Sequence, residues 1–589
     1  MIDSYQKFLF DRRAALMIAG TGVLTSILVL QMINLQVFNR RRFQRLAQSN
    51  IFRVHIEIPR RGVIYAANGV ELAHDEQVFR LFIIPRDMNN YEQGLEFLRV
   101  NLGLNERTMA RIARTRRRQR AFQPILIREK LSWQKMAELS ALNMPGIYIR
   151  QGFSRRYPFG SMASHTIGYL SEPRDSTVPF FKTGRAGLER IYNDKLMGTT
   201  GQTMNIANAE GMIIGEDRSQ SFPAIAGDSL QTTINRDIQR ALDTEIQRLV
   251  SGTGIVMDLE TGDILAMSSY PAFNADLFGS EDGEDYMTEL RNDPLKPFLN
   301  KTLDGLYSPG SVFKVVVALA GLEMGVINPR ERIRCTGEWR LGNHLFHCWA
   351  RHGHGMMDLH DAMARSCDVY FYVQSLKIGI DAISAMARRL GMGARVFTNY
   401  DESERPGIIP TREWKEANTG VPWVMGDTVI TAIGQGFVLA NNMQLAVMMG
   451  AAVTNYKVKP RLTFDKPIVR EYMMLNPGNI AINNRSLEAV IFDDRGTARA
   501  SRVDVNGRRM AGKTGTTQVR RISLEERISG IRRQEDLPRE LRNHGIFTGF
   551  APSNNPRYVV SIVAEHIGSG SIAARSAAAV MREVLRVKS

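Results

Sequence analysis

The chain has 589 residues, with 76 lysines and arginines against 60 acidic residues and a formal charge of +16. This length exceeds one domain and predicts roughly three to four compact units. With 44% hydrophobic residues, 22 prolines and three cysteines, the composition excludes disordered, collagen-like and disulfide-dense proteins. A basic balance suits nucleic acid, a membrane surface or an acidic polymer alike, so the distribution of the charges must distinguish them.

An uncharged stretch of 25 residues, 14–38, lies near the N-terminus between arginine clusters. At about 1.5 Å per helical residue, a helix of this length crosses a bilayer. We therefore predict a single transmembrane helix at 14–38 after a short cytoplasmic tail, 1–13, rather than a buried core helix. No small-x-small cleavage site follows and the first cysteine is Cys335, which favours a retained anchor over a cleaved signal peptide or a lipoprotein.

Residues 39–225 have the pattern of an extended α+β region. The segment 52–58 alternates at period two before Pro59, as a half-buried strand does. A helix is expected at 105–120, whose seven arginines we interpret as a solvated face rather than a contact with an anionic partner.

A second, larger α/β domain is expected at 226–589. The sequence predicts an amphipathic helix over 238–249, followed by strands at 254–258 and 263–267 that are joined by a turn. A charged stretch, 518–543, carries seven arginines and five acidic residues and suits an exposed insertion beside a functional strand.

The strongest chemical signal is the segment 308–314, Ser-Pro-Gly-Ser-Val-Phe-Lys, which opens an apolar helical run. Ser311 is expected in the first helical turn, near unpaired backbone N–H groups and the positive end of the helix dipole. Lys314 follows three residues later and projects from the same face. If burial lowers the pKa of Lys314, this lysine can take the serine proton as a general base.

A second signal is the segment 513–516, Lys-Thr-Gly-Thr, which lies in a β-rich stretch. Gly515 lets a substrate backbone approach, and Lys513 supplies a fixed positive charge. The tripeptide Lys-Thr-Gly also occurs at 182–184, but only the copy at 513 follows the serine in the chain.

A third segment, Ser366-Cys367-Asp368, begins 55 residues after Ser311. With it, the chain resembles the serine penicillin-binding proteins, which carry three such motifs in this order. The middle motif of that family is usually Ser-x-Asn, so Asp368 is a departure, although it occurs in the elongation-specific class B branch.

The resemblance covers nearly the whole chain and includes motifs on both sides of the catalytic segments. The Pro-Thr-Arg-Glu-Trp-Lys block and the Ser-x-Asp motif are similar to the elongation-specific class B enzymes rather than to their septal relatives. Asn300, in Leu299-Asn300-Lys301, matches a recurring position whose role is open. The other matching segments are 59–64, 68–69, 72–73, 156–158, 164–169, 187–189 with Tyr192, 426–428, 433–436 and 547–552.

The resemblance implies an α/β multi-domain architecture. One N-terminal transmembrane helix precedes an extended α+β pedestal at 39–225. A transpeptidase domain of the penicillin-binding-protein and β-lactamase type follows at 226–589.

The resemblance also implies the chemistry of a peptidoglycan DD-transpeptidase. Ser311 would attack the D-alanyl-D-alanine carbonyl of a stem peptide, and a neighbouring stem's amine would resolve the acyl-enzyme into a crosslink. Lys314 would be the base for acylation, and Ser366 would relay protons with Lys513. The backbone N–H groups of Ser311 and Thr516 would form the oxyanion hole. The residues expected to bind substrate are Asp368, Thr514, Gly515 and Thr516.

The same resemblance implies the setting of the enzyme. The enzyme would be a single-pass protein of the bacterial inner membrane with most of the chain in the periplasm. It would react covalently with β-lactams. Its partners would be a RodA-type SEDS glycosyltransferase and a rod-complex scaffold protein. The positive-inside rule taken literally would place the C-terminal part in the cytoplasm, but long translocated domains often disregard it. Alternatives are a septal class B transpeptidase, a DD-carboxypeptidase and a β-lactam-sensing protein that uses the same serine.

All three cysteines and five of the ten histidines lie between Cys335 and Cys367. Such a cluster of thiol and imidazole ligands suits zinc, which would be structural because the chemistry needs no cofactor. A Cys335–Cys348 disulfide and three free thiols are alternatives, because spacing does not determine connectivity. The expected zinc ligands are Cys335, Cys348, His354 and Cys367.

The basic surplus belongs to the membrane-proximal part of the chain. Residues 40–225 carry 29 basic and 17 acidic side chains, whereas residues 226–589 carry 44 and 41. The surplus is therefore 12 in the first region and 3 in the second. This distribution favours anionic lipid, an acidic wall polymer or an acidic partner, and argues against nucleic acid.

Overall fold

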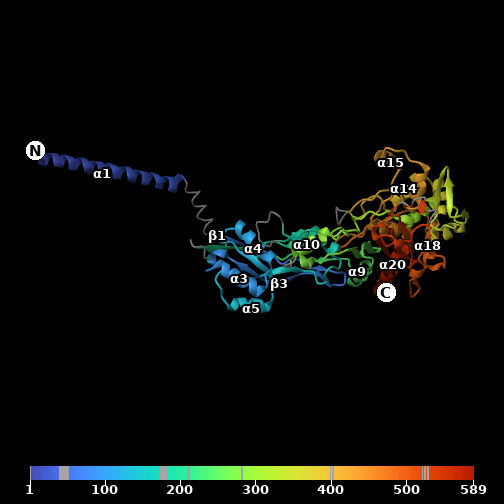
Figure 1. Ribbon diagram of the computed structural model, residues 1–589, viewed down its shortest axis with the longest axis horizontal. Helices are drawn as coiled ribbons and strands as arrows, with labels where there is room; N and C mark the ends of the chain where they lie inside the picture. Colours follow the sequence, from blue (N-terminus) through green and yellow to red (C-terminus); the bar gives the residue numbers. More distant parts are fainter. Residues whose placement is uncertain are drawn as a thin grey trace. The chain divides into compact units, whose positions relative to one another are not determined.

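The structure is a computed structural model that describes residues 2–38, 52–172, 182–207, 213–279, 283–397, 400, 404–520, 522, 525–526 and 530–588. Its internal contacts divide the chain into two compact units (Figure 1). The first unit comprises residues 1–60, 177–179 and 197–227, and the second comprises 61–176, 180–196 and 228–589. The arginines at 40–42 and parts of the stretch 518–543, at 521, 523–524 and 527–529, lie outside the described residues.

The first unit contains a helix and a small sheet. Helix α1 (Ile2–Ile33) continues into a π-helical turn, η1 (Asn34–Phe38), over the predicted 14–38 segment. None of the described helices is long and apolar enough to span a membrane. Strand β1 (Phe52–Glu57), predicted from its alternation, pairs antiparallel with β8 (Gly201–Ala207), which pairs in turn with β9 (Ile213–Glu216).

In the second unit, residues before 200 form a sheet with its own small core. The long strand β3 (Glu71–Ile83) pairs antiparallel with β2 (Ile64–Tyr65), β4 (Ile125–Leu131) and β5 (Ile147–Arg156), and β2 pairs in parallel with β10 (Leu230–Gln231). Leucine and isoleucine side chains of β3 and β4 form this core with those of α3 (Tyr91–Leu102), α4 (Glu106–Arg118) and α5 (Trp133–Ala141). Helix α4 is the predicted arginine-rich helix; it buries Ile112, while most of its arginines are exposed, as predicted.

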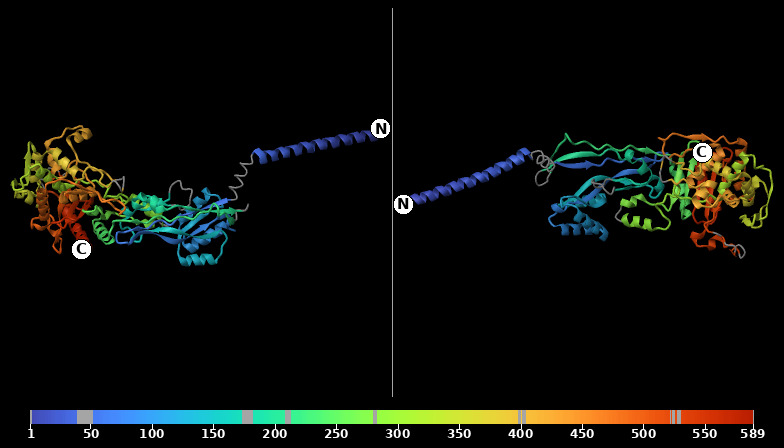
Figure 2. Two further views of the ribbon diagram at one scale, coloured as in Figure 1. Left: turned by 180° about the vertical axis from the view of Figure 1, so that it is seen from behind. Right: turned by 90° about the horizontal axis from the view of Figure 1, so that it is seen from above.

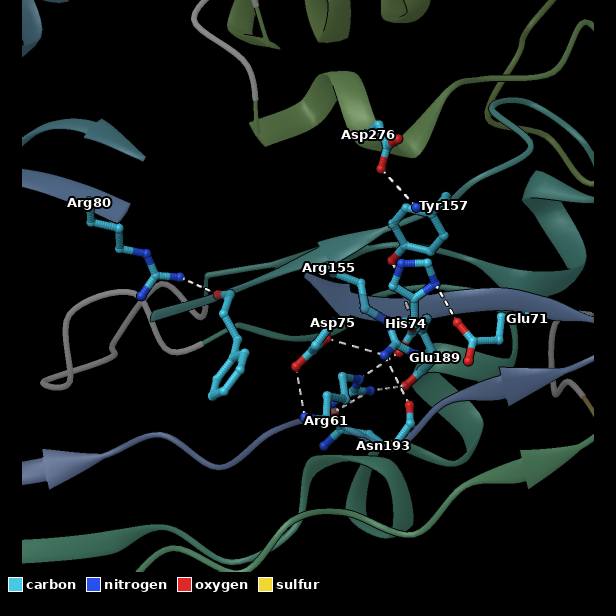
Figure 3. A network of polar contacts seen from close by, with 12 residues as sticks. Arg61, Glu71, His74, Asp75, Arg80, Arg155, Tyr157, Glu189, Asn193 and Asp276 are labelled. Carbon is cyan, nitrogen blue, oxygen red and sulfur yellow. Dashed lines mark hydrogen bonds and ion pairs between the residues drawn. The ribbon is translucent and has the colours of Figure 1, made fainter. Parts of the chain in front are cut away.

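A buried polar network joins four segments of this region (Figure 3). Glu189, on α7 (Gly187–Ile191), accepts hydrogen bonds from Nε of Arg61 and Nε of Arg155, each at 2.7 Å. Asp75 of β3 accepts from the backbone N–H of Arg61 at 2.7 Å and from Nη1 of Arg155 at 3.2 Å. Two guanidinium groups therefore balance two carboxylates, which is the arrangement that buried charges require.

The largest sheet of the second unit is antiparallel, in the order β12-β11-β23-β22-β21. Strands β11 (Gly252–Asp258) and β12 (Ile264–Tyr270) form the predicted hairpin. Every residue of β11 and of β23 (Tyr558–Ala564) is buried, so both faces of the sheet are covered. The last two strands are β22 (His544–Ala551) and β21 (Ala511–Thr517).

Helices cover the two faces of this sheet from opposite sides. A Cβ on Gly254 would contact α9 (Arg236–Arg248), the predicted amphipathic helix, whereas Ser561 on the other face bonds Asn442 of α17 (Asn442–Thr454). Helix α20 (Gly570–Val587) packs on α9, β22 and β23, and Figure 2 shows it in red against segments of the same unit.

Further described helices complete the second unit: α6 (Ser164–Ile167), α8 (Asn193–Met197), α10 (Gly283–Asn292), α11 (Lys314–Glu323), α12 (Leu359–Ala364), α13 (Asp368–Ile378), α14 (Ile380–Arg389), α15 (Arg412–Thr419), α16 (Met425–Ala432) and α18 (Pro477–Phe492). Short antiparallel pairs lie between them: β6 (Leu170–Ser171) with β7 (Thr183–Gly184), β13 (Ile333–Cys335) with β16 (Gly355–Met357), β14 (Glu338–Leu341) with β15 (His344–His347), β17 (Tyr456–Val458) with β18 (Arg470–Tyr472), and β19 (Asp504–Val505) with β20 (Arg508–Arg509).

Candidate active site

Ser311 lies in a short 3-10 turn, η4 (Gly310–Phe313), which leads directly into α11. The sequence predicted the first turn of an α-helix; the turn is tighter, and Gly310 enters it at a φ of 55° that favours glycine. The Gly310 N–H donates to the carbonyl of Gly434 at 2.9 Å. A Cβ on Gly434 would lie 2.1 Å from the Gly310 oxygen, so this contact admits only glycine at 434. The turn that carries the nucleophile is thus fixed from a second segment.

Four of the predicted residues meet next to this turn. Lys314 is fully buried, and its Nζ donates to Asp368 Oδ1 at 2.7 Å and to the carbonyl and hydroxyl oxygens of Ser366 at 2.9 and 3.3 Å. Lys513 is also fully buried and donates to Ser366 Oγ at 2.9 Å. The hydroxyl of Ser366 therefore lies between two lysine amines, as a proton relay requires.

Ser311 stands one helical turn from this group. Within the described part of the chain, its hydroxyl makes no hydrogen bond to Nζ of Lys314, which is directed at Ser366 and Asp368. Catalytic hydrogen bonds are often long without substrate and tighten in the complex. A general-base role of Lys314 would therefore require its contact with Ser311 to form when substrate binds.

Burial and neighbouring charges shift the pKa values of Lys513 and Asp368. Burial lowers the pKa of Lys513 well below its ordinary value, and the positive charge of Lys314 lowers it further, against the opposing effect of Asp368. Burial raises the pKa of Asp368, which the charge of Lys314 opposes. Burial thus favours release of the Lys513 proton, whereas the sequence analysis expected this side chain to supply a fixed positive charge.

Asp368 was expected to face substrate, but both of its oxygens bind protein groups. Oδ1 accepts from Lys314, and Oδ2 accepts from the backbone N–H of Trp349 at 2.9 Å. The indole Nε1 of Trp349 also donates to the carbonyl of Ser366 at 3.1 Å. Ser366 has a φ of 54°, an uncommon conformation for serine, and this bond helps to hold it there. No sequence motif pointed to Trp349.

Strand β21 is an edge strand whose side chains alternate between two sides. On one side, Lys513 reaches Ser366, and Thr517 donates its hydroxyl to the carbonyl of Ser308. On the other side lie Thr514, whose Oγ1 is 2.7 Å from a neighbouring threonine hydroxyl, and the exposed Thr516. The two threonines that the resemblance assigns to the substrate carboxylate therefore share one side of the strand.

The backbones of the nucleophile turn and of β21 lie in close contact. A Cβ on Gly515 would lie 2.6 Å from the carbonyl oxygen of Pro309, and one on Gly310 would lie 3.2 Å from the nitrogen of Thr516. Gly515 is thus required by the turn, in addition to the substrate approach expected for it. This contact places Gly310, the residue before Ser311, beside the backbone of Thr516. The N–H groups of Ser311 and Thr516 are the two that were expected to form the oxyanion hole.

The predicted zinc ligands also converge. The ligand atoms of Cys335, Cys348, His354 and Cys367 all lie within 4.8 Å of one another, and all four residues are buried. The three cysteines are free thiols, so the alternative Cys335–Cys348 disulfide is not present. His354 Nδ1 lies 3.6 Å from the sulfur of Cys335 and 3.5 Å from that of Cys348. A set of three thiolates and one imidazole is a donor set that suits tetrahedral zinc.

Comparisons with known proteins identify the family of the chain. The family profile of the penicillin-binding protein transpeptidase domain matches residues 252–586, and that of the penicillin-binding protein dimerisation domain matches residues 56–232. The peptidoglycan D,D-transpeptidase MrdA of Haemophilus influenzae is 32% identical over 98% of this chain and 92% of its own length. MrdA of Escherichia coli is 29% identical over 98% of this chain and 94% of its own length. A Helicobacter pylori penicillin-binding protein, PBP2, solved in complex with MreC, matches 91% of this chain and 99% of its own with a TM-score of 0.77 and 26% identity.

The chain belongs to the penicillin-binding protein transpeptidase family. Within that family it is a class B enzyme and a serine-type D-Ala-D-Ala transpeptidase, which confirms the class predicted from its motifs. Enzymes of this family need no cofactor for their chemistry.

Proposed function

We propose that this chain crosslinks peptidoglycan stem peptides during lateral wall elongation, with Ser311 as the nucleophile. The observation that carries the assignment of roles is the hydroxyl of Ser366, held 3.3 Å from Nζ of Lys314 and 2.9 Å from Nζ of Lys513 beside the nucleophile turn. The elongation role is supported by the similarity to MrdA enzymes and to a PBP2 that was solved in complex with MreC.

In the first half-reaction, Oγ of Ser311 bonds to the carbonyl carbon of the penultimate D-alanine while Lys314 takes the serine proton. The C–N bond to the terminal D-alanine breaks, and the leaving amine receives a proton through Ser366. The backbone N–H groups of Ser311 and Thr516 stabilise the oxyanion, and each such donor is commonly worth about 3 kcal/mol. The product is an ester between Ser311 and the shortened stem.

In the second half-reaction, the amine of a neighbouring stem attacks the ester carbonyl. The amine gives up a proton through the hydroxyl of Ser366 to the lysine pair, and Ser311 regains a proton as its ester bond breaks. Lys513, whose pKa burial and the charge of Lys314 lower, is suited to accept and return that proton. One amide bond is exchanged for another, so the reaction needs no external energy source.

Labelling with a fluorescent penicillin tests the nucleophile. We expect the wild type to be acylated and Ser311→Ala to be unlabelled; labelling that survives in Ser311→Ala refutes the assignment. Incubation of the full-length protein with stem-peptide substrates then separates the outcomes. Crosslinked dimers support a transpeptidase, whereas release of D-alanine without dimers indicates the carboxypeptidase alternative.

We further propose that residues 14–38 anchor the enzyme in the bacterial inner membrane, with residues 39–225 as a pedestal and residues 226–589 as the transpeptidase domain in the periplasm. The length of the uncharged stretch and the arginines that bound it support the membrane anchor. The periplasmic placement follows from the proposed peptidoglycan substrate. Deletion of residues 1–38 should move the protein from the membrane fraction to the soluble fraction, and membrane retention of the deletion variant would count against the anchor.

The expected partners follow from the elongation role. The Helicobacter pylori relative was solved with MreC, and we propose that this chain binds a scaffold protein of that kind and a RodA-type SEDS glycosyltransferase. Co-purification of the tagged full-length chain from its own membranes tests both partners. A tagged chain that recovers neither partner contradicts this part of the proposal.

The buried thiol and imidazole cluster is proposed to hold a structural zinc ion. Cys335, Cys348, His354 and Cys367 supply its donors, and Cys367 is part of the Ser-x-Asp motif, so the metal would brace Ser366 and Asp368. We expect about one zinc per purified chain, lost with a lowered melting temperature in Cys348→Ser. Wild-type protein without stoichiometric zinc would refute the site.

A further inference from the structure

A buried ionic cluster lies outside the catalytic group, at the motif whose role the sequence left open. Asn300 itself caps a turn, since its side chain accepts from the N–H of Thr302 at 3.2 Å. The next residue, Lys301, is 2% exposed, and its Nζ donates to Glu565 Oε2 at 2.7 Å and to Ser251 Oγ at 2.6 Å. Glu565 thus receives an ammonium partner from a loop that is distant in sequence.

The other oxygen of Glu565 leads to the nucleophile turn. Oε1 accepts a hydrogen bond from the hydroxyl of Tyr307 at 2.7 Å. Tyr307 is buried and precedes Ser308, the first residue of the segment that carries Ser311. The chain of contacts therefore runs from Lys301 through Glu565 and Tyr307 to the nucleophile.

The electrostatics keep this chain of contacts intact. Although burial acts to raise it, the charge and hydrogen bond of Lys301 hold the pKa of Glu565 below its ordinary value, so Glu565 is a carboxylate. Burial and the charge of Glu565 raise the pKa of Tyr307 well above its ordinary value, so its phenol keeps its proton. A buried hydrogen bond from a neutral phenol to a paired carboxylate is charge-assisted and strong.

Other contacts of Tyr307 show why its side chain matters. Its backbone exchanges two hydrogen bonds with Ala440, each at 2.9 Å, and the following carbonyl, of Ser308, accepts from Thr517. These bonds fix the peptide groups of the turn against neighbouring segments. The Tyr307–Glu565 bond ties the turn to the end of the central strand β23, so it is a separate constraint on where Ser311 stands.

We propose that Lys301, Glu565 and Tyr307 are positioning residues. Through their buried contacts they hold the turn that carries Ser311 at its position relative to Lys314 and Lys513. The inference rests on the proposed role of Ser311. Displacing a nucleophile by about 1 Å can cost 100-fold in rate, so loss of one tether is expected to slow acylation without weakening binding of the substrate.

The test is pre-steady-state acylation of the full-length protein by a fluorescent penicillin, which separates the acylation rate constant from the binding constant. Tyr307→Phe removes one hydroxyl and should lower the rate constant about tenfold, with the binding constant changed less than twofold. Lys301→Met should lower the rate constant about 100-fold, and Lys301→Arg, which keeps the charge beside Glu565, should restore it to within about threefold of wild type.

Thr302→Val is the matched control. Thr302 lies in the same loop and is fully buried, but its hydroxyl contacts Thr253 at 2.6 Å and the carbonyl of Ser268, not Glu565. It should lower the melting temperature about as much as Tyr307→Phe while leaving the acylation rate constant within twofold of wild type. Equal rate losses in Tyr307→Phe and Thr302→Val, or unchanged rates in Tyr307→Phe and Lys301→Met, overturn the proposal. A wild type that is not acylated contradicts the proposed function instead.

Discussion

Replacing Lys513 by arginine separates a proton carrier from a fixed charge. Both side chains can carry a positive charge, but arginine does not release its proton in proteins. In the structure Lys513 is fully buried, and its Nζ is 2.9 Å from Ser366 Oγ, the atom through which protons are proposed to pass. If Lys513 only supplied positive charge, Lys513→Arg would preserve its function.

The expected loss follows from the role of a general acid or base. Such a group typically contributes a factor of about 10² to 10⁴ in rate, or roughly 3 to 5 kcal/mol at 1.36 kcal/mol per tenfold. We therefore expect Lys513→Arg to slow acylation by a fluorescent penicillin by at least about 100-fold. A charge-only role predicts a loss smaller than about tenfold.

The pH dependence distinguishes this effect from the larger size of arginine. Protonated Lys513 is the form that can supply a proton through Ser366 to the leaving amine, and its pKa is lowered, so acylation should fall as pH rises through a value below that of an ordinary lysine. Below that pKa Lys513 is protonated and can donate. This fall should be absent in Lys513→Arg, because arginine stays protonated across the range. The same fall in both proteins would refute the reasoning.

Two further substitutions test how the fold supports the site. Glu189→Gln leaves the buried guanidinium of Arg61 without its carboxylate partner and leaves Arg155 with Asp75 alone, so it should destabilise the protein by about 3 to 5 kcal/mol, seen as a lowered urea midpoint. Glu583→Gln, in an exposed ion pair, should cost less than about 1 kcal/mol, and equal shifts would contradict the network. Gly434→Ala should slow acylation about 100-fold, because its Cβ would press on Gly310. Gly420 has the same φ of 70° but open space around it, so Gly420→Ala should lower stability without slowing acylation. Similar acylation rates in the two variants would show that the contact between Gly434 and Gly310 does not matter.

The local elements were largely predictable because their signals lie within short segments. The apolar run after Lys314, the period-two strand at β1 and the hairpin β11–β12 each carry their own pattern, and each was observed. The exception at the nucleophile was the 3-10 turn of Ser311. That turn is shaped by contact between Gly310 and Gly434, which lies in another part of the chain.

The partners of the catalytic residues were less predictable. Asp368 was expected to face substrate because its motif does so in the family, yet its oxygens bind Lys314 and the backbone of Trp349. Neither contact has a sequence signal, since Trp349 belongs to the loop between β15 and β16. Tyr307 and Glu565 meet across 258 residues, and no spacing rule connects them.

The sequence by itself determined which chemical groups the enzyme has. A serine and a lysine three residues apart at the start of a helix share one face because of the helical periodicity. The order of the three motifs along the chain identified the family. Only the tertiary structure decided how those groups behave. The pKa of Lys513 depends on its burial and on the charge of Lys314, and its contact with Ser366 joins residues 147 apart in the chain. Burial and pairing of this kind arise when the sheet and its helices close around the site, because a charge that is removed from water responds to every charge packed beside it.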